Sequence, residues 1–283
     1  MRVPRVSRIV FVAGPAYRNT NGSIPEQART NGDQQRSAAI SDGRRWPAWS
    51  SCAGRDAHLA GGGALAPMGH RYRVRCAFVE VHELEIAGAW VFTPRQHTDD
   101  RGTFLEWFRS ETVVEAVGHP LHLAQANHSV SRRGTLRGIH YAAVPPSQAK
   151  YVTCVHGRVL DCVVDIRLGS PTYGTHQAVL LDDVDRKGLY LAEGLGHSFM
   201  ALTDNAAISY ICSTPYSPAR EYGIDPLDPD LTLPWPRDVT PLLSEKDARA
   251  PSLKEAEAAG LLPSYSACTA YYETLRIQAG RGQ

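Results

Sequence analysis

A small set of side chains in this sequence could transfer protons or bind an anion. The proton-transfer candidates are His140, Lys150, His197, Tyr210 and Asp247, and the anion-binding candidates are Arg101 and Arg137. Imidazole titrates near neutral pH, so a histidine can serve as an acid or a base there. Guanidinium groups suit the oxygens of phosphate. These residue types favour general acid–base chemistry on an anionic ligand.

The segment LRGIHYAAVPPSQAKYV, residues 136–152, contains three of these groups on two expected strands. On an ideal strand His140 and Arg137 point to opposite faces, so a twist or bulge at Gly138 is needed to bring both to one ligand. We expect that bulge, and we expect Lys150 on the next strand to face the same cavity. Considered as an isolated pair, a core histidine beside an outward-pointing lysine is the simpler interpretation, because buried unpaired cations are costly.

Other kinds of site find little support. Two histidines separated by one residue on a strand often hold a metal, but the residue two positions after His140 is Ala142, so we expect no metal. The glycine-rich nucleotide motifs and the G-x-S-x-G hydrolase motif are absent from the sequence. The six cysteines lack C-x-x-C spacing, which favours buried free thiols over a disulfide framework.

The elements that must position these residues are mostly strands. From Phe78 onward, short alternating or apolar runs broken by turns predict an all-β sandwich or barrel with a few short helices. The expected strands are 88–94, 103–108, 122–130, 136–142, 149–155, 158–167, 176–181, 188–192, 197–202 and 206–214. We interpret His156-Gly157 as a tight hairpin. Helices are expected at Ser110–Gly118 and after a capping box at Ser252–Glu255, with a short helical tail.

Residues 1–76 differ in composition from the remainder. They carry twelve arginines, no lysine and four acidic residues, with scattered hydrophobic residues and no sustained period. We expect a disordered extension, with Met68 as an alternative start, and a single domain over 77–283. An arginine-rich arm for nucleic acid is the alternative, but it lacks interleaved aromatic residues, so we expect no nucleic-acid partner. No run approaches the ~18 apolar residues of a membrane span, and we expect a cytoplasmic protein.

Seven motifs occur in a characteristic order along the chain. They are DDRGTFLEWF, QANHSVSRRGTLRGIHY, PSQAKYV, VVDIRLGSPTYG, GLGHSF, SYICSTPYSPAREYGI and LPWPRDVTPLLSEKDARAP. Together, over about residues 84–255, they resemble the dTDP-4-dehydrorhamnose 3,5-epimerase family of metal-free cupins. The tail EAEAAGLLPSY is more similar to the branch that serves antibiotic deoxysugars. The resemblance implies a cupin jelly roll, no cofactor and a dTDP-4-keto-6-deoxyhexose substrate.

The resemblance also implies roles for individual residues. His140 matches the base, Asp247 its orienting carboxylate, Lys150 the group that stabilises the enolate oxygen, and Tyr210 the donor that returns a proton to the opposite face. Arg101, Arg137 and Lys246 match positions that hold diphosphate or nucleotide, and Tyr216 matches the residue that stacks on thymine. Substrate contacts match Gln125, Asn127, Glu106, His197 and Glu221. The family implies a homodimer with exchanged N-terminal strands, in which Arg101 and Glu106 come from the partner.

Several departures from the family pattern leave the substrate pocket less defined. The family's Q-D-N reads Gln125-Ala126-Asn127 here, and its H-G-F reads His197-Ser198-Phe199. Whether C3 alone or both C3 and C5 are inverted therefore stays open. The alternatives are a cupin 3,4-ketoisomerase on the same substrate and a non-catalytic cupin that binds a sugar nucleotide. A metal-dependent cupin oxygenase is a weaker alternative.

Overall fold

The computed structural model describes residues 73–75 and 79–281. Most of the extension expected to be disordered lies outside the described residues. Arg73–Arg75 is an exception, since it forms strand β1 and pairs with residues 80–82.

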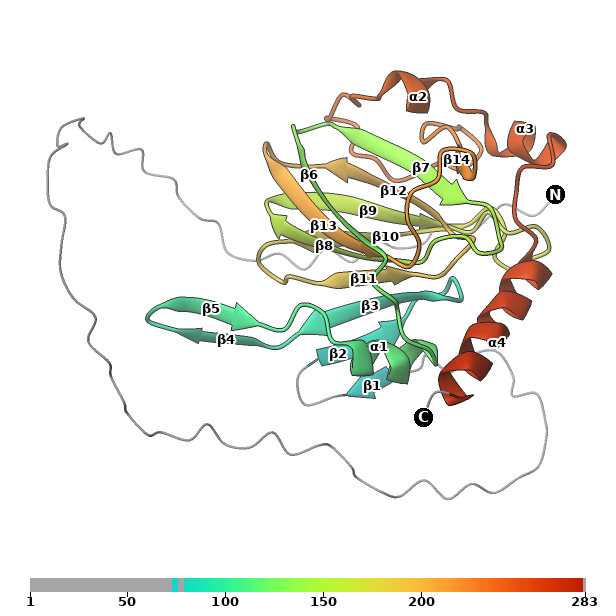
Figure 1. Cartoon of the computed structure of the whole chain (residues 1–283). Coiled ribbons are helices and arrows are strands. Elements are labelled where there is room, and N and C mark those ends of the chain that lie inside the picture. Colours follow the sequence, from blue (N-terminus) through green and yellow to red (C-terminus); the bar gives the residue numbers. More distant parts are fainter. Residues whose placement is uncertain (1–72, 76–78, 282–283) are drawn as a thin grey trace, which may run out of the picture. The chain divides into compact units, whose positions relative to one another are not determined.

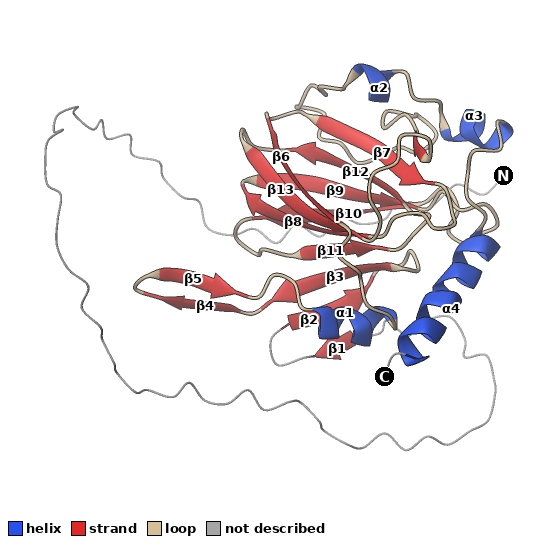
Figure 2. Ribbon diagram, viewed as in Figure 1, coloured by secondary structure: helices blue, strands red, loops and turns tan. Residues whose placement is uncertain are grey.

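Two antiparallel sheets form a sandwich, which confirms the all-β expectation (Figure 1, Figure 2). The seven-stranded sheet has the order β1 (Arg73–Arg75), β2 (Val79–Glu83), β3 (Ala89–Pro94), β11 (Gly188–Leu191), β8 (Lys150–His156), β13 (Ala206–Cys212) and β6 (Gln125–Ser131). The five-stranded sheet has the order β10 (His176–Asp182), β9 (Arg158–Val164), β12 (Gly196–Ala201), β7 (Leu136–Ala142) and β14 (Glu221–Gly223). A separate two-stranded ribbon consists of β4 (Gln96–Asp99) and β5 (Gly102–Leu105).

The main core lies between the two large sheets. Val152 and Ile208 from the seven-stranded sheet and Val163 and Phe199 from the five-stranded sheet all belong to one buried cluster. The edge strand β6 alternates between partly buried and exposed residues, as expected for a strand covered on one face. By contrast, β9 lies inside its sheet and is buried along most of its length.

The hairpin predicted at His156-Gly157 is wrong. The two residues do join β8 to β9, but β8 pairs with β11 and β13, whereas β9 pairs with β10 and β12 in the other sheet. The chain therefore crosses from one sheet to the other at this turn. Gly157 has φ +74°, and a Cβ there would lie 2.3 Å from Oγ1 of Thr203, so the crossing requires glycine. A two-residue turn signal does not show which strands pair.

The helices agree with the expected start and stop signals. Helix α1 (Ser110–Val117) ends at Gly118, which has φ +89°. The capping box of α3 (Leu253–Ala258) is formed by Ser252 and Glu255. The short helix α2 (Glu245–Ala248) lies beside β7, and α4 (Tyr265–Arg281), with 17 residues, is longer than the short tail we expected. None of the helices in the described residues is long and apolar enough to span a membrane.

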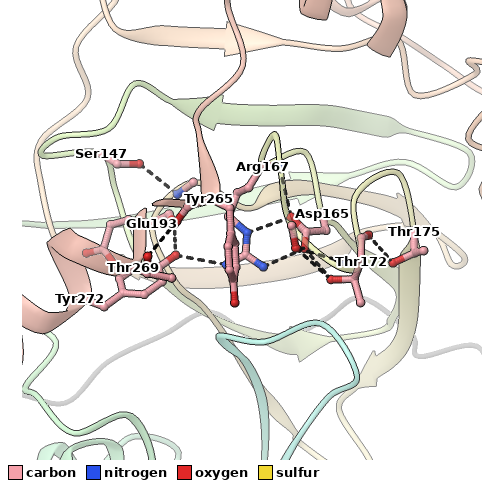
Figure 3. A network of polar contacts seen from close by, with 11 residues as sticks. Ser147, Asp165, Arg167, Thr172, Thr175, Glu193, Tyr265, Thr269 and Tyr272 are labelled. Carbon is pink, nitrogen blue, oxygen red and sulfur yellow. Dashed lines mark hydrogen bonds and ion pairs between the residues drawn. The ribbon is translucent and has the colours of Figure 1, made fainter. Parts of the chain in front are cut away.

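A buried polar network attaches α4 to the sandwich (Figure 3). The Arg167 guanidinium donates to Asp165 at 2.8 Å, and both side chains are fully buried. The Tyr265 ring centroid lies 5.0 Å from the Arg167 guanidinium carbon. The Tyr272 hydroxyl accepts from Arg167 and donates to the backbone oxygen of Glu193. Tyr265 and Tyr272 thus attach the helix to the buried Arg167, whose charge is paired with Asp165.

Candidate active site

One cavity of about 410 Å³ collects most of the candidate residues. Its lining comes from both large sheets and from the segment that leads into α2. The lining residues are Gln125, Asn127, Thr135, Leu136, Arg137, His140, Gln148, Lys150, Tyr210, Tyr216, Glu221, Leu242, Ser244, Lys246 and Asp247. All the proton-transfer candidates except His197 are present.

The expected bulge in β7 is confirmed and explains how two residues reach this cavity. In the strand register, His140 lies opposite His197 and Arg137 lies opposite Phe199. The segment between these two partners is therefore one residue longer in β7 than in β12, which is a β-bulge. Both His140 and Arg137 consequently line the cavity. Gly138 has φ +102°, and a Cβ there would lie 2.4 Å from the backbone oxygen of His197. Only glycine fits this position without a backbone shift.

His140 forms a close pair with Asp247. Nε2 of His140 lies 2.7 Å from Oδ1 of Asp247, and the exposed fractions of the two side chains are 36% and 7%. A carboxylate only accepts, so Nε2 carries the proton and Nδ1 keeps the lone pair. Burial by itself would raise the pKa of Asp247, but hydrogen bonds from His140, Ser244 and the backbone of Gly138 lower it below its usual value. A charged carboxylate thus orients the imidazole and can stabilise its protonated form.

Tyr210 and Lys150 enter the same cavity from the facing sheet. Tyr210 lies on β13 and Lys150 on the neighbouring strand β8, where it pairs with Cys212. Burial raises the pKa of Tyr210, as do Cys212 and the Glu221 carboxylate, and the nearby Arg137 cation only partly offsets them. The phenol therefore keeps its proton at neutral pH and can act as a donor.

The polar groups at the cavity rim are arranged by β6 and the loop after β13. The Gln125 amide donates to Oδ1 of Asn127 at 2.8 Å, and its oxygen accepts from the backbone N–H of Tyr216 at 2.8 Å. Tyr216 is 54% exposed, so its ring is available to a flat ligand. Glu221 on β14 and Lys246 on α2 complete this part of the lining.

Three sequence candidates are absent from the cavity lining, and two of them belong to the β4–β5 ribbon and the segment after it. Arg101 lies in the turn between β4 and β5, where its guanidinium pairs with Asp99. Glu106 follows the ribbon and accepts from Arg109 at 3.2 Å. Neither residue lines the cavity.

His197 lies beside His140 rather than in the cavity lining. The two residues are register partners on β12 and β7, and the His197 side chain is only 11% exposed. Its Nε2 lies 2.9 Å from both carboxylate oxygens of Asp161, which is fully buried. Sequence reasoning missed Asp161, although an acidic residue inside the apolar run LDCVVD was the available signal.

Within residues 73–75 and 79–281, no group of three or more His, Cys, Asp or Glu side chains is placed to hold a metal ion. The four described cysteines, Cys154, Cys162, Cys212 and Cys268, are buried free thiols, as expected.

The chain is similar to proteins of one family over most of its described length. The family model described as dTDP-4-dehydrorhamnose 3,5-epimerase matches residues 83–255. The chain is 56% identical over 194 residues to a dTDP-4-dehydrorhamnose 3,5-epimerase of Mycolicibacterium smegmatis, and the match covers 69% of this chain and 96% of that protein. It is 54% identical over 192 residues to a dTDP-4-dehydrorhamnose 3-epimerase of Streptomyces niveus, covering 68% and 92% respectively.

A similar solved structure is a 3′-monoepimerase from Streptomyces bikiniensis in complex with dTDP-quinovose. It has a TM-score of 0.68 and 50% sequence identity, and the match covers 69% of this chain and 98% of that one.

Proposed function

Because the chain belongs to the dTDP-4-dehydrorhamnose 3,5-epimerase family, we propose that it is an isomerase that inverts C3, or both C3 and C5, of a dTDP-4-keto-6-deoxyhexose. Its relatives include both 3-epimerases and 3,5-epimerases, several of them from Streptomyces. Deoxysugar biosynthesis is therefore its setting. The observation that carries the proposal is that His140 and Tyr210 enter one cavity from two facing sheets.

The proposed reaction begins with proton abstraction next to the ketone. Nδ1 of His140 takes the proton from C3, and the electrons of the broken C–H bond move to the C4 oxygen as an enolate. The Lys150 ammonium stabilises this oxygen as its charge develops. Asp247 stabilises the imidazolium that forms, because its charged oxygen lies 2.7 Å from Nε2.

Inversion requires that the new proton arrive from the other face of the ring. The electrons return from the enolate oxygen, the ketone re-forms, and C3 takes the phenolic proton of Tyr210. No atom is oxidised or reduced over the cycle. His140 and Tyr210 then regain their starting protonation by exchange with solvent.

The remaining lining residues suit the nucleotide part of the substrate. Arg137 and Lys246 are cations that can pair with diphosphate oxygens. Tyr216 offers an exposed ring for thymine, while Gln125, Asn127 and Glu221 offer polar groups to the sugar. In support, related solved structures contain dTDP or a dTDP-sugar.

Isotope exchange tests the proposal directly. Proton NMR of dTDP-4-keto-6-deoxyglucose in deuterated water should show enzyme-dependent deuterium at C3, and the signal at C5 reports whether that carbon also reacts. His140→Asn should slow exchange by about 10²–10⁴-fold. Tyr210→Phe should permit exchange but impair inversion.

Three other outcomes identify the alternatives. A 3-keto sugar as product would show a ketoisomerase. Saturable binding with no exchange at any carbon would show a non-catalytic cupin. Loss of activity on chelation would show a metal-dependent enzyme.

We further propose a homodimer in which each β4–β5 ribbon reaches the active site of the partner. The ribbon projects from the sandwich (Figure 1), and Phe104 on it is 69% exposed. Arg101 at its turn pairs with Asp99 two residues away and lies outside the cavity of its own chain. A guanidinium supplied by the partner's ribbon would complete the cationic group formed by Arg137 and Lys246.

Mixed dimers test this arrangement. Arg101→Ala and His140→Asn chains are coexpressed, each variant being inactive alone. If Arg101 acts across the interface, the mixed dimer has one intact site, and about a quarter of the wild-type activity returns for a random two-fold assembly. If Arg101 acts within its own chain, no activity returns.

A further inference from the structure

We propose that Ser244 is a positioning residue, which holds the Asp247 carboxylate in the orientation that accepts the Nε2 proton of His140. This inference rests on the function proposed above. Ser244 precedes α2 with an extended backbone (φ −73°, ψ 159°) and occupies its N-cap. Two hydrogen bonds join this serine to Asp247.

The two bonds give the Ser244 hydroxyl a defined direction. Its oxygen accepts from the backbone N–H of Asp247 at 3.1 Å, and its own proton is donated to Oδ2 of Asp247 at 2.9 Å. Oδ1 of the same carboxylate accepts from His140 at 2.7 Å. Each carboxylate oxygen therefore has a separate donor, and rotation of the carboxylate would break both bonds.

The Asp247 carboxylate needs this orienting hydrogen bond because Asp247 lies outside the sheets. The final side-chain torsion of aspartate has a broad energy profile, so its carboxylate plane is set by contacts rather than by rotamer preference. Helix α2 has only four residues and provides little rigidity. The segment before it is tied to the start of β7, since Leu242 exchanges backbone hydrogen bonds with Gly134 and Leu136. Ser244 extends this attachment from the backbone to the carboxylate.

A positioning role differs measurably from a substrate contact, which matters because Ser244 also lines the cavity. Ser244→Ala and Ser244→Gly both remove the hydroxyl, and glycine retains most of the N-cap preference. Both variants should lower kcat by about 10- to 100-fold, as expected for a misplaced catalytic group, while KM changes little. The Ser244 hydroxyl helps to lower the pKa of Asp247, so both variants should raise that pKa, and the loss of kcat/KM on the acid side should begin at a higher pH than in the wild type.

Ser244→Thr is the matched control, since it keeps the hydroxyl and the cap. It should restore kcat and the pH profile to within about 3-fold of wild type, or ~0.7 kcal/mol at 1.4 kcal/mol per factor of ten. A loss of activity in Ser244→Thr equal to that in Ser244→Ala would overturn the proposal. An unchanged kcat in Ser244→Gly, or a rise in KM alone, would overturn it too.

A second readout does not depend on turnover. The Nε2 proton of His140 should give a hydrogen-bonded, downfield NMR resonance in the wild-type protein and in Ser244→Thr. In Ser244→Gly it should move upfield or disappear through solvent exchange, and an unchanged resonance would overturn the inference. If the wild-type protein catalyses no isotope exchange, the proposed function fails, yet this spectrum still tests whether Ser244 orients Asp247.

Discussion

Gly138→Ala tests whether the β7 bulge sets the geometry of the active site. Gly138 has φ +102°, where a residue with a side chain is strained by about 1–3 kcal/mol. The added Cβ would lie 2.4 Å from the His197 backbone oxygen, 3.0 Å from Cα of Ser198 and 3.1 Å from the His140 backbone nitrogen. Such overpacking destabilises the folded state by about another 1–3 kcal/mol. The free energy of unfolding should therefore fall by about 2–6 kcal/mol, a large part of the ~5–15 kcal/mol of a typical domain.

Activity should fall more than stability alone explains. The displaced groups include the backbone of His140 itself, so the imidazole should move relative to Asp247. Urea unfolding followed by circular dichroism measures the stability change, and deuterium exchange at C3, measured well below the unfolding midpoint, measures the chemical step. Slow exchange in a sample that is still folded would identify the bulge as a requirement of the site.

Gly169→Ala is the matched control for the backbone conformation. Gly169 has φ +82°, but a Cβ there would meet no atom within 4 Å. This variant has the conformational cost without the steric collision. The difference in free energy of unfolding between Gly138→Ala and Gly169→Ala therefore measures the collision with β12. If Gly138→Ala is no less stable than Gly169→Ala and exchanges deuterium at the wild-type rate, the reasoning about the bulge is refuted.

Three further predictions concern stability and are checked by urea unfolding. Burial raises the pKa of Glu193 to about 7, so the folded state holds a proton that the unfolded state releases near pH 4.5. The free energy of unfolding should therefore fall by up to about 3 kcal/mol from pH 4.5 to 7. Glu193→Gln should remove this pH dependence, and an equal pH dependence in the variant and the wild type would contradict the prediction. Arg167→Met leaves the buried Asp165 carboxylate without its cation and should lower the free energy of unfolding by about 3–5 kcal/mol. Adding Asp165→Asn to the same chain should recover part of this loss. If the losses of the two single variants simply add in the double variant, the two residues do not act as a pair. Ser252→Ala breaks the capping box of α3 and should cost about 1 kcal/mol, whereas Ser252→Thr should cost little.

Local sequence signals predicted local structure well. The strand expected at 136–142 has those bounds, and the helix expected to stop at Gly118 ends there. The need for a bulge at Gly138 also followed from local geometry, because alternation along a strand cannot place Arg137 and His140 on one side. Each of these features depends on residues that are close in the chain.

Features that depend on distant residues were missed. The turn at His156-Gly157 looked like a hairpin because nothing near it shows that β8 pairs with strands some 35 and 55 residues further along the chain. The partnership of Asp161 with His197 joins two neighbouring strands, β9 and β12, whose residues lie 36 positions apart in the chain. The anchoring of α4 depends on Arg167, which the sequence presents only as one charge in the motif VVDIR. Pairings of this kind are set by the topology rather than by spacing.

The placement of His140 and Tyr210 on different sheets makes the gap between base and acid a property of the hydrophobic interior. Any substitution that swells or shrinks the layer between the sheets alters the thickness of the slot in which a sugar ring must fit. Volume changes at Val152 or Phe199, neither of which lines the cavity, are thus a route by which evolution or an engineer can retune turnover.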